Sequence, residues 1–163
     1  MANNVGLVPG VLAGATWTDA GFGASDASFN SLATGSFVLA GTALSPSQSD
    51  TDLLMDISFS ITGTTGSSGT PYFSLFILPL NQDGTTYGDG TPTGAVPPNS
   101  QYWVQNAGVL LSQSGVPLVG MFQGLEIPWG NFKVGIAQFT GNALAAAAAA
   151  TIKFRTYTPN TNL

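Results

Sequence analysis

The chain has 163 residues, a length typical of one domain with a core of ordinary size. It contains neither cysteine nor histidine, which excludes disulfides, thiolate metal sites and nucleophiles activated by histidine. Its net charge of −5, with only three basic residues, argues against DNA or RNA as a partner, because phosphate binding needs a basic face.

Charged residues make up 7% of the chain, against about 25% in an average soluble domain. A polar surface built from Ser, Thr, Asn and Gln can be buried against partner chains without desolvating ions. This composition favours a subunit of an assembly over a freely diffusing enzyme. No apolar run approaches the roughly 18 residues of a membrane helix, and the apolar Val5–Ala15 lacks the positive flank of a signal peptide. We therefore expect a soluble chain made in the cytoplasm, without a membrane partner or an export signal of its own.

Residues 1–33 are rich in Gly, Ala, Ser and Asn and sustain no helical period. Their scattered aromatic side chains are Trp17, Phe22 and Phe29. We expect an extended N-terminal arm that docks on the domain or on a neighbouring subunit, and a disordered terminus is the alternative. Residues 34–163 are expected to form a single β-sandwich domain.

Short β-like segments follow the arm. Leu53–Thr62 alternates between apolar and polar residues, as a half-buried strand does, whereas Tyr72–Leu80 is apolar almost throughout and should be covered on both faces. Gly120 and Gly124 predict bulges or close packing within their strand. The long Asn81–Asn99 stretch has no periodicity and predicts a functional or interface loop. The further expected strands are Ser36–Gly41, Tyr102–Leu111 and Val116–Ile127.

The stretch Pro128–Tyr157 holds two more β-like segments and all three basic residues, Lys133, Lys153 and Arg155. A Gly-Asn turn signal between the segments predicts a hairpin that closes the sheet. If Phe139 pairs near Thr151, Lys133 falls opposite Arg155. Two like charges facing each other need a carboxylate, supplied by Glu126, by Asp56 or by another subunit.

The alanine tract Ala145–Ala150 is too short to sustain a helix in water. It predicts a passage of small residues packed under other chain, with one helical turn as the alternative. Altogether the pattern predicts an all-β, antiparallel sandwich or barrel of about seven or eight strands.

The carboxylates do not form a recognisable catalytic or metal-binding motif. Asp50, Asp52 and Asp56 form one group and Asn81, Asp83 and Asp89 another, but neither has the spacing of a calcium loop, and turn formation explains most of them. Paired carboxylates for glycoside hydrolysis are the one hydrolytic mechanism left open, and Glu126 is the only glutamate. We expect no enzyme activity, no catalytic residue, no metal and no cofactor.

Aromatic and basic side chains are the candidate contacts with partners. Trp103, Trp129, Tyr87 and Tyr102 could form a sugar-binding surface, but packing in the core or at a subunit interface explains them equally well. The candidate interface residues are Trp17, Phe22, Tyr87, Trp103, Trp129, Lys133, Lys153 and Arg155.

Several stretches, in a shared order, resemble the small decoration and cement proteins of tailed-bacteriophage capsids. They are Phe29-Asn-Ser-Leu-Ala-Thr-Gly-Ser, Asp52-Leu-Leu-Met-Asp-Ile, Leu78-Pro-Leu-Asn-Gln-Asp-Gly-Thr-Thr-Tyr-Gly-Asp-Gly, Ile127-Pro-Trp-Gly-Asn-Phe-Lys-Val, Thr140-Gly-Asn-Ala-Leu-Ala and Ile152-Lys-Phe-Arg-Thr-Tyr. The resemblance covers most of residues 29–157. The chain departs from that family in having Trp129 where a second proline is usual and an alanine tract where a Gly/Asn turn is expected.

The resemblance implies a jelly-roll-like sandwich that binds the outside of an icosahedral shell as a dimer or trimer. Its partner would be the major capsid protein, and its location the virion surface. No catalytic residue is implied, because the family is structural. The rival hypothesis is a tail-fibre or receptor-binding module that recognises cell-surface glycan through Trp103, Trp129 or Tyr87.

Overall fold

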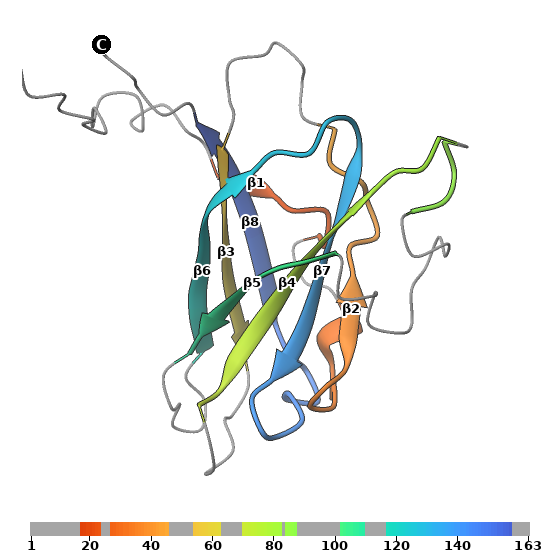
Figure 1. Ribbon diagram of the computed structural model, residues 1–163. Coiled ribbons are helices and arrows are strands. Elements are labelled where there is room, and N and C mark those ends of the chain that lie inside the picture. The colour runs from red at the N-terminus through yellow and green to blue at the C-terminus, as the bar shows by residue number, and fades with distance from the viewer. Residues whose placement is uncertain are drawn as a thin grey trace, which may run out of the picture.

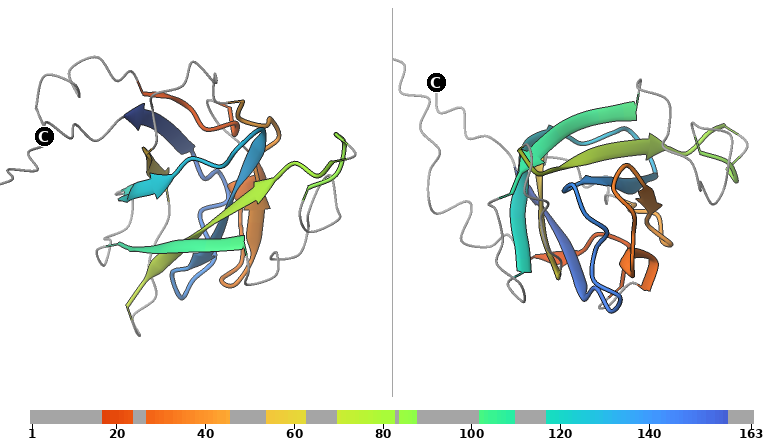
Figure 2. Two further views of the ribbon diagram at one scale, coloured as in Figure 1. Left: turned by 45° about the horizontal axis from the view of Figure 1, so that its top comes forward. Right: turned by 90° about the horizontal axis from the view of Figure 1, so that it is seen from below.

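The protein folds into two four-stranded antiparallel sheets packed face to face (Figures 1 and 2). The computed structural model describes residues 17–23, 27–45, 54–62, 70–82, 84–87, 102–109 and 117–157. The all-β antiparallel sandwich expected from the sequence is confirmed. Its strands are β1 (Thr18–Asp19), β2 (Phe37–Leu39), β3 (Leu54–Thr62), β4 (Tyr72–Pro79), β5 (Trp103–Gly108), β6 (Pro117–Glu126), β7 (Phe132–Phe139) and β8 (Ala150–Tyr157), with one 3₁₀ turn, η1 (Ala27–Phe29).

The strand order is that of a jelly roll. One sheet runs β1-β8-β3-β6 and the other β2-β7-β4-β5. The first strand therefore lies beside the last, the second beside the seventh, the third beside the sixth and the fourth beside the fifth. This is the order produced when one long antiparallel hairpin wraps around a core, with successive strands changing sheet except at β4 and β5, which pair with each other.

The core lies between the two sheets, and alternation along the strands selects its members. On β3, Met55, Ile57, Phe59 and Ile61 are fully buried and point inward. The Phe59 ring packs against Phe73 and Phe122, with ring centroids 4.9 and 5.4 Å apart. The contact with Phe73 joins the two sheets across the core, and the contact with Phe122 links two neighbouring strands of one sheet.

A second apolar cluster lies on the outer face of the β2-β7-β4-β5 sheet. Strand β4 is buried along both faces, as its continuous apolar sequence predicts. Its inward residues join the main core, while Phe76 and Leu78 pack on the other side with Phe37, Tyr87 and Ala137. The rings of Phe37 and Phe76 meet edge to face at 5.5 Å. This sheet is therefore covered on both sides, whereas the other sheet leaves much of its outer face exposed.

The hairpin predicted within Pro128–Tyr157 is wrong. Both segments are strands, but β7 pairs with β2 and β4, and β8 pairs with β1 and β3. The connection of residues 140–149 crosses from one sheet to the other because Leu144 and Ala148 are buried in the main core. Lys133 consequently lies opposite Leu78, and Arg155 lies opposite Asp56 rather than opposite Lys133.

The alanine tract packs as a passage of small residues, as expected. Ala148 and Ala150 are buried, and the tract contains a turn and the first residue of β8 but no helix. The Ser31 amide donates a hydrogen bond to the Ala145 carbonyl at 2.9 Å, and the Leu144 amide donates to the Leu32 carbonyl at the same distance. Small side chains permit this close approach of two backbone segments.

Gln138 joins these two connections from inside the fold. It is fully buried, and its amide nitrogen donates to the carbonyls of Leu32 and Asn142 at 2.8 and 3.0 Å. Its amide oxygen accepts from the backbone and the hydroxyl of Thr140. All four hydrogen-bonding positions of the side chain are used, so Gln138 fixes the β1–β2 and β7–β8 connections to each other.

Part of the expected N-terminal arm belongs to the sandwich. Thr18 and Asp19 pair with β8, while Ala20, Phe22 and Phe29 are buried in the main core. Residues 1–16 lie outside the described residues. The described part of the expected arm, residues 17–23 and 27–33, therefore packs on the sandwich.

Both glycines singled out in β6 have the predicted roles. Gly124 has a φ of +66° at a bulge, where the β3·β6 register shifts between Met55 and Ile57. Gly120 lies over the Phe59 ring so closely that any Cβ would overlap it.

Candidate interaction surfaces

Three connections of the chain leave from the same end of the sandwich. Leu54 lies opposite both Glu126 and Tyr157, so β3 begins where β6 and β8 end. Pro79 lies opposite Phe132, so β4 ends where β7 begins. The connections of residues 40–53, 80–102 and 127–131 therefore leave from this one end, which Figure 1 shows at the top. We call it the loop end.

Trp129 is the most exposed large apolar side chain of the described residues, with 94% of its surface accessible. It lies at the loop end between Pro128 and Gly130, whose φ is +85°. The short loop is braced, because the Leu80 amide donates to the Asn131 carbonyl at 2.8 Å and Phe132 bridges to Leu44. A large aromatic side chain is thus exposed to water on a loop whose backbone is held by hydrogen bonds, which is the arrangement of an interface anchor.

Trp103, at the start of β5, lies opposite Phe76 in the middle of β4 and is 49% exposed. Its indole nitrogen donates to Asn106 Oδ1 at 3.0 Å, and Ser74 donates to the same oxygen at 2.6 Å. The indole is therefore held in one orientation. Tyr102, beside it, is half-buried against the outer cluster of the β2-β7-β4-β5 sheet.

Tyr87 and Phe22 lie within the chain's own packing. Tyr87 belongs to the outer cluster, and Lys133 Nζ lies 4.8 Å from the centre of its ring. Phe22 is buried in the main core against Phe29, with ring centroids 5.6 Å apart. Of the sugar-binding candidates, Trp103 and Trp129 therefore offer exposed aromatic surface and Tyr87 does not.

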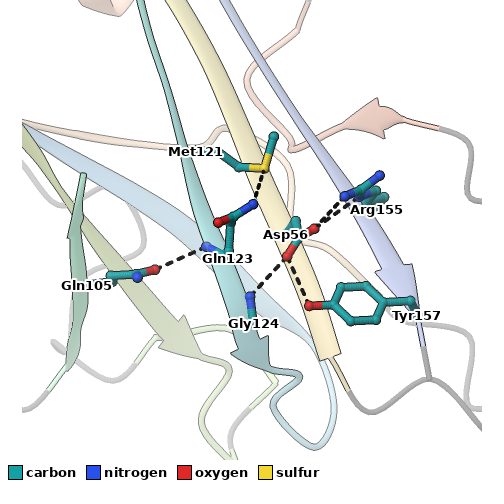
Figure 3. A network of polar contacts seen from close by, with 7 residues as sticks. All are labelled: Asp56, Gln105, Met121, Gln123, Gly124, Arg155 and Tyr157. Atoms are coloured by element: carbon teal, nitrogen blue, oxygen red, sulfur yellow. Dashed lines mark hydrogen bonds and ion pairs between the residues drawn. The ribbon is translucent and has the colours of Figure 1, made fainter. Parts of the chain in front are cut away.

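Asp56 is the centre of a polar network on the outer face of the β1-β8-β3-β6 sheet (Figure 3). Its Oδ2 accepts from Arg155 Nε at 3.1 Å and from Nη2 at 2.8 Å. Its Oδ1 accepts from the Gly124 amide at 3.0 Å and from the Tyr157 hydroxyl at 3.1 Å. The carboxylate therefore ties three neighbouring strands together at the bulge of β6.

Trp17 and Tyr157 lie at the rim of this network. Trp17 packs over Arg155, with the guanidinium carbon 4.7 Å from the ring centre, so it covers the ion pair from the side of β1. Burial, together with the charge of Asp56 and the hydrogen bond to it, raises the pKa of Tyr157. Asp56 is thus the acidic partner of Arg155, one of the possibilities open in the sequence. Lys153 lies two residues away on the same face and is exposed.

The carboxylates of the described residues do not gather into a metal site. No group of three potential ligands occurs among these residues, and Asp56 is occupied by its ion pair. Asp50, Asp52, Asp83 and Asp89 lie outside them. No buried side-chain nitrogen or oxygen in the described part of the chain lacks a hydrogen-bond partner.

Two exposed residues of β6 were not singled out in the sequence. Val119 is 61% and Met121 is 37% exposed, and they alternate with buried Leu118 and Phe122. The period of two that reveals them is visible in the sequence, but it cannot tell an exposed edge strand from a covered one.

In comparisons with known proteins, no family model and no curated protein matches the chain. In the ranges that the structure describes, no helix is long and apolar enough to cross a bilayer.

Proposed function

We propose that this protein is a non-enzymatic virion subunit that decorates the outside of an icosahedral bacteriophage capsid and cements neighbouring major capsid subunits. The observation that carries the proposal is Trp129, an almost fully exposed tryptophan on a braced loop at the loop end. The resemblance of six ordered sequence stretches to capsid decoration proteins supplies the partner. The low content of charged residues agrees with a surface that is covered in an assembly.

In this proposal the loop end faces the shell. Trp129 inserts between capsid subunits, and the sandwich acts as a rigid strut. Burying an indole removes about 200 Å² from water, which corresponds to at most about 5 kcal/mol for each copy before the cost of association. The braced loop lowers that cost, because its backbone does not have to be ordered on binding.

The proposal is tested with particles that lack this protein. Adding back the purified chain should restore resistance to heat and osmotic shock, and Trp129→Ala should bind the particles weakly while keeping the wild-type melting temperature. Thr151→Ala is a control, because Thr151 is exposed near the end of β8 that lies away from the loop end. If particles without the protein withstand heat and osmotic shock as well as complete ones, the cementing function is wrong.

A glycan-binding tail module is the second candidate, and the exposed side chains of Trp103 and Trp129 favour it. Copy number separates the two functions. A denaturing gel of purified virions should show this chain in amounts comparable with the major capsid protein if it decorates the shell, and comparable with tail proteins if it binds a receptor. Glycan binding that is abolished by Trp129→Ala would favour the tail module.

A further inference from the structure

Strand β6 is a long open sheet edge. It is the outermost strand of the β1-β8-β3-β6 sheet and has ten residues, whereas the other edge strands, β1, β2 and β5, have two, three and six. Open edges present unpaired backbone groups, and proteins usually protect them with charges, short strands or bulges. From Pro117 to Leu125, β6 carries no charged residue.

The backbone groups that this edge offers follow from the register. The Thr62 amide donates to the Ala149 carbonyl at 3.1 Å, so Thr62 faces β8. Because successive residues of a strand face opposite neighbours, Ile61, Phe59 and Ile57 face β6. Their partners on β6 are Leu118, Gly120 and Phe122.

Val119 and Met121, between those partners, therefore direct their N–H and C=O groups away from the sheet. Neither amide has an acceptor among the residues described. The flanking positions are closed to donation: Pro117 has no N–H, and the Gln123 amide already donates to Gln105 Oε1 at 3.2 Å (Figure 3). The open part of the edge thus has two free donors, bounded on both sides.

The side chains at this edge are apolar. Val119 and Met121 are 61% and 37% exposed on the outer face of the sheet, and their neighbours across the strand pair are Ser60 and Ser58. The bulge at Gly124 ends the regular part of the strand. An apolar pair beside two unpaired amides is a surface for strand addition.

We propose that β6 pairs with β6 of a second copy of this chain, antiparallel, about a two-fold axis at Gly120. In this register Val119 lies opposite the partner's Met121, and Met121 lies opposite the partner's Val119. Each copy donates both free amides to the carbonyls of the other, and the four apolar side chains meet on the outer face. The β1-β8-β3-β6 sheets of the two copies thereby become one continuous sheet across the dimer.

Self-complementarity selects a second copy as the occupant. Pro117, which has no amide hydrogen, falls opposite the partner's Gln123, whose amide is already used, so the pairing leaves no donor unsatisfied. Two copies that each carry a net charge of −5 repel each other. This edge keeps the repulsion small, because it has no charged residue from Pro117 to Leu125 and Asp56 is paired with Arg155. The dimer does not depend on binding to a capsid.

Sedimentation equilibrium of the purified full-length chain tests the dimer. The expected mass is twice the 16.6 kDa of one chain, with a dimer fraction that rises with concentration. Met121→Lys should give a monomer with an unchanged circular-dichroism spectrum. Val119→Pro should do the same, because it removes an outward amide and no hydrogen bond to β3. Val104→Lys is the matched control, since Val104 has the same exposure as Met121 but lies on β5, and it should remain dimeric.

Cysteine cross-linking tests the register, and the chain has no cysteine of its own to interfere. Oxidising a mixture of Val119→Cys and Met121→Cys chains should give the mixed disulfide. Neither variant alone should cross-link, because identical residues are offset by two positions along the paired strands and a disulfide needs Cα atoms within about 7 Å. A wild-type chain that is monomeric at every concentration overturns the proposal. So does a dimer that survives Met121→Lys, or one whose Val119→Cys chains cross-link to each other.

Discussion

Replacing Asp56 by Asn should lower stability far more than an equal change of charge elsewhere. Asp56 is 3% exposed and accepts hydrogen bonds from Arg155, Tyr157 and the Gly124 amide. Asn keeps the shape and one acceptor oxygen. Its NH₂ group, however, must face either the guanidinium or the donors on the other side, so donor meets donor and Arg155 loses its counter-charge.

The size of the effect follows from burial. Removing one partner of a fully buried ion pair costs about 3–5 kcal/mol. The Arg155 side chain is 22% exposed, so water relieves part of that cost, and the lower end, about 3 kcal/mol, is expected. For a chain of this length, that corresponds to a fall in melting temperature of roughly 6–12 °C.

Urea and thermal unfolding, followed by circular dichroism, measure this loss. Glu126→Gln is the matched control, because it removes the same charge from an exposed residue of β6 and should change stability by less than about 0.5 kcal/mol. If Asp56→Asn unfolds at the same urea concentration as Glu126→Gln, the network around Asp56 does not stabilise the sheet.

Three further changes test other parts of the fold. Gln138→Leu leaves the Thr140 amide and two carbonyls without their partner, and urea unfolding should show a loss of about 3 kcal/mol; a loss below about 1 kcal/mol would contradict its role in fixing the connections. Gly135→Ala places a Cβ against the Phe37 ring and should lower the melting temperature by an amount equivalent to about 1–3 kcal/mol; an unchanged temperature would mean that β2 shifts freely. The raised pKa of Tyr157 contributes stability that is complete below its ordinary value of 10.0 and is lost as pH rises through the raised pKa. Wild type should therefore lose stability more steeply than Tyr157→Phe above pH 10.0, and parallel curves for the two chains would contradict the assignment.

The sequence predicted the strands well because alternation is a local property. Leu53–Thr62 differs from β3 by one residue, and the apolar run at Tyr72–Leu80 correctly indicated a strand covered on both faces. Which strands pair with each other depends on distant residues, and for this reason the hairpin prediction failed. A Gly-Asn turn after Phe139 was compatible with a hairpin, but the burial of Leu144 and Ala148 in the core carries the chain to the opposite sheet.

The candidate surfaces could be predicted only in part, for the same reason. Trp129 and Tyr87 are both aromatic residues in connections, yet one is almost fully exposed and the other is buried on the outer face of a sheet. The difference depends on where each connection docks. Likewise, Arg155 and its partner Asp56 are 99 residues apart, so the sequence could name the acidic candidates but not choose between them.

The jelly-roll strand order makes the two halves of the chain depend on each other completely. Each ladder between the eight strands joins one of β1–β4 to one of β5–β8, and neither set contains a ladder of its own. A nascent chain that ends before β5 therefore has no sheet to build, and folding must wait for distant pairings that form slowly. Conversely, a cut within residues 88–101 would leave two fragments interleaved strand by strand, so this connection is the natural place to divide the protein into complementary halves.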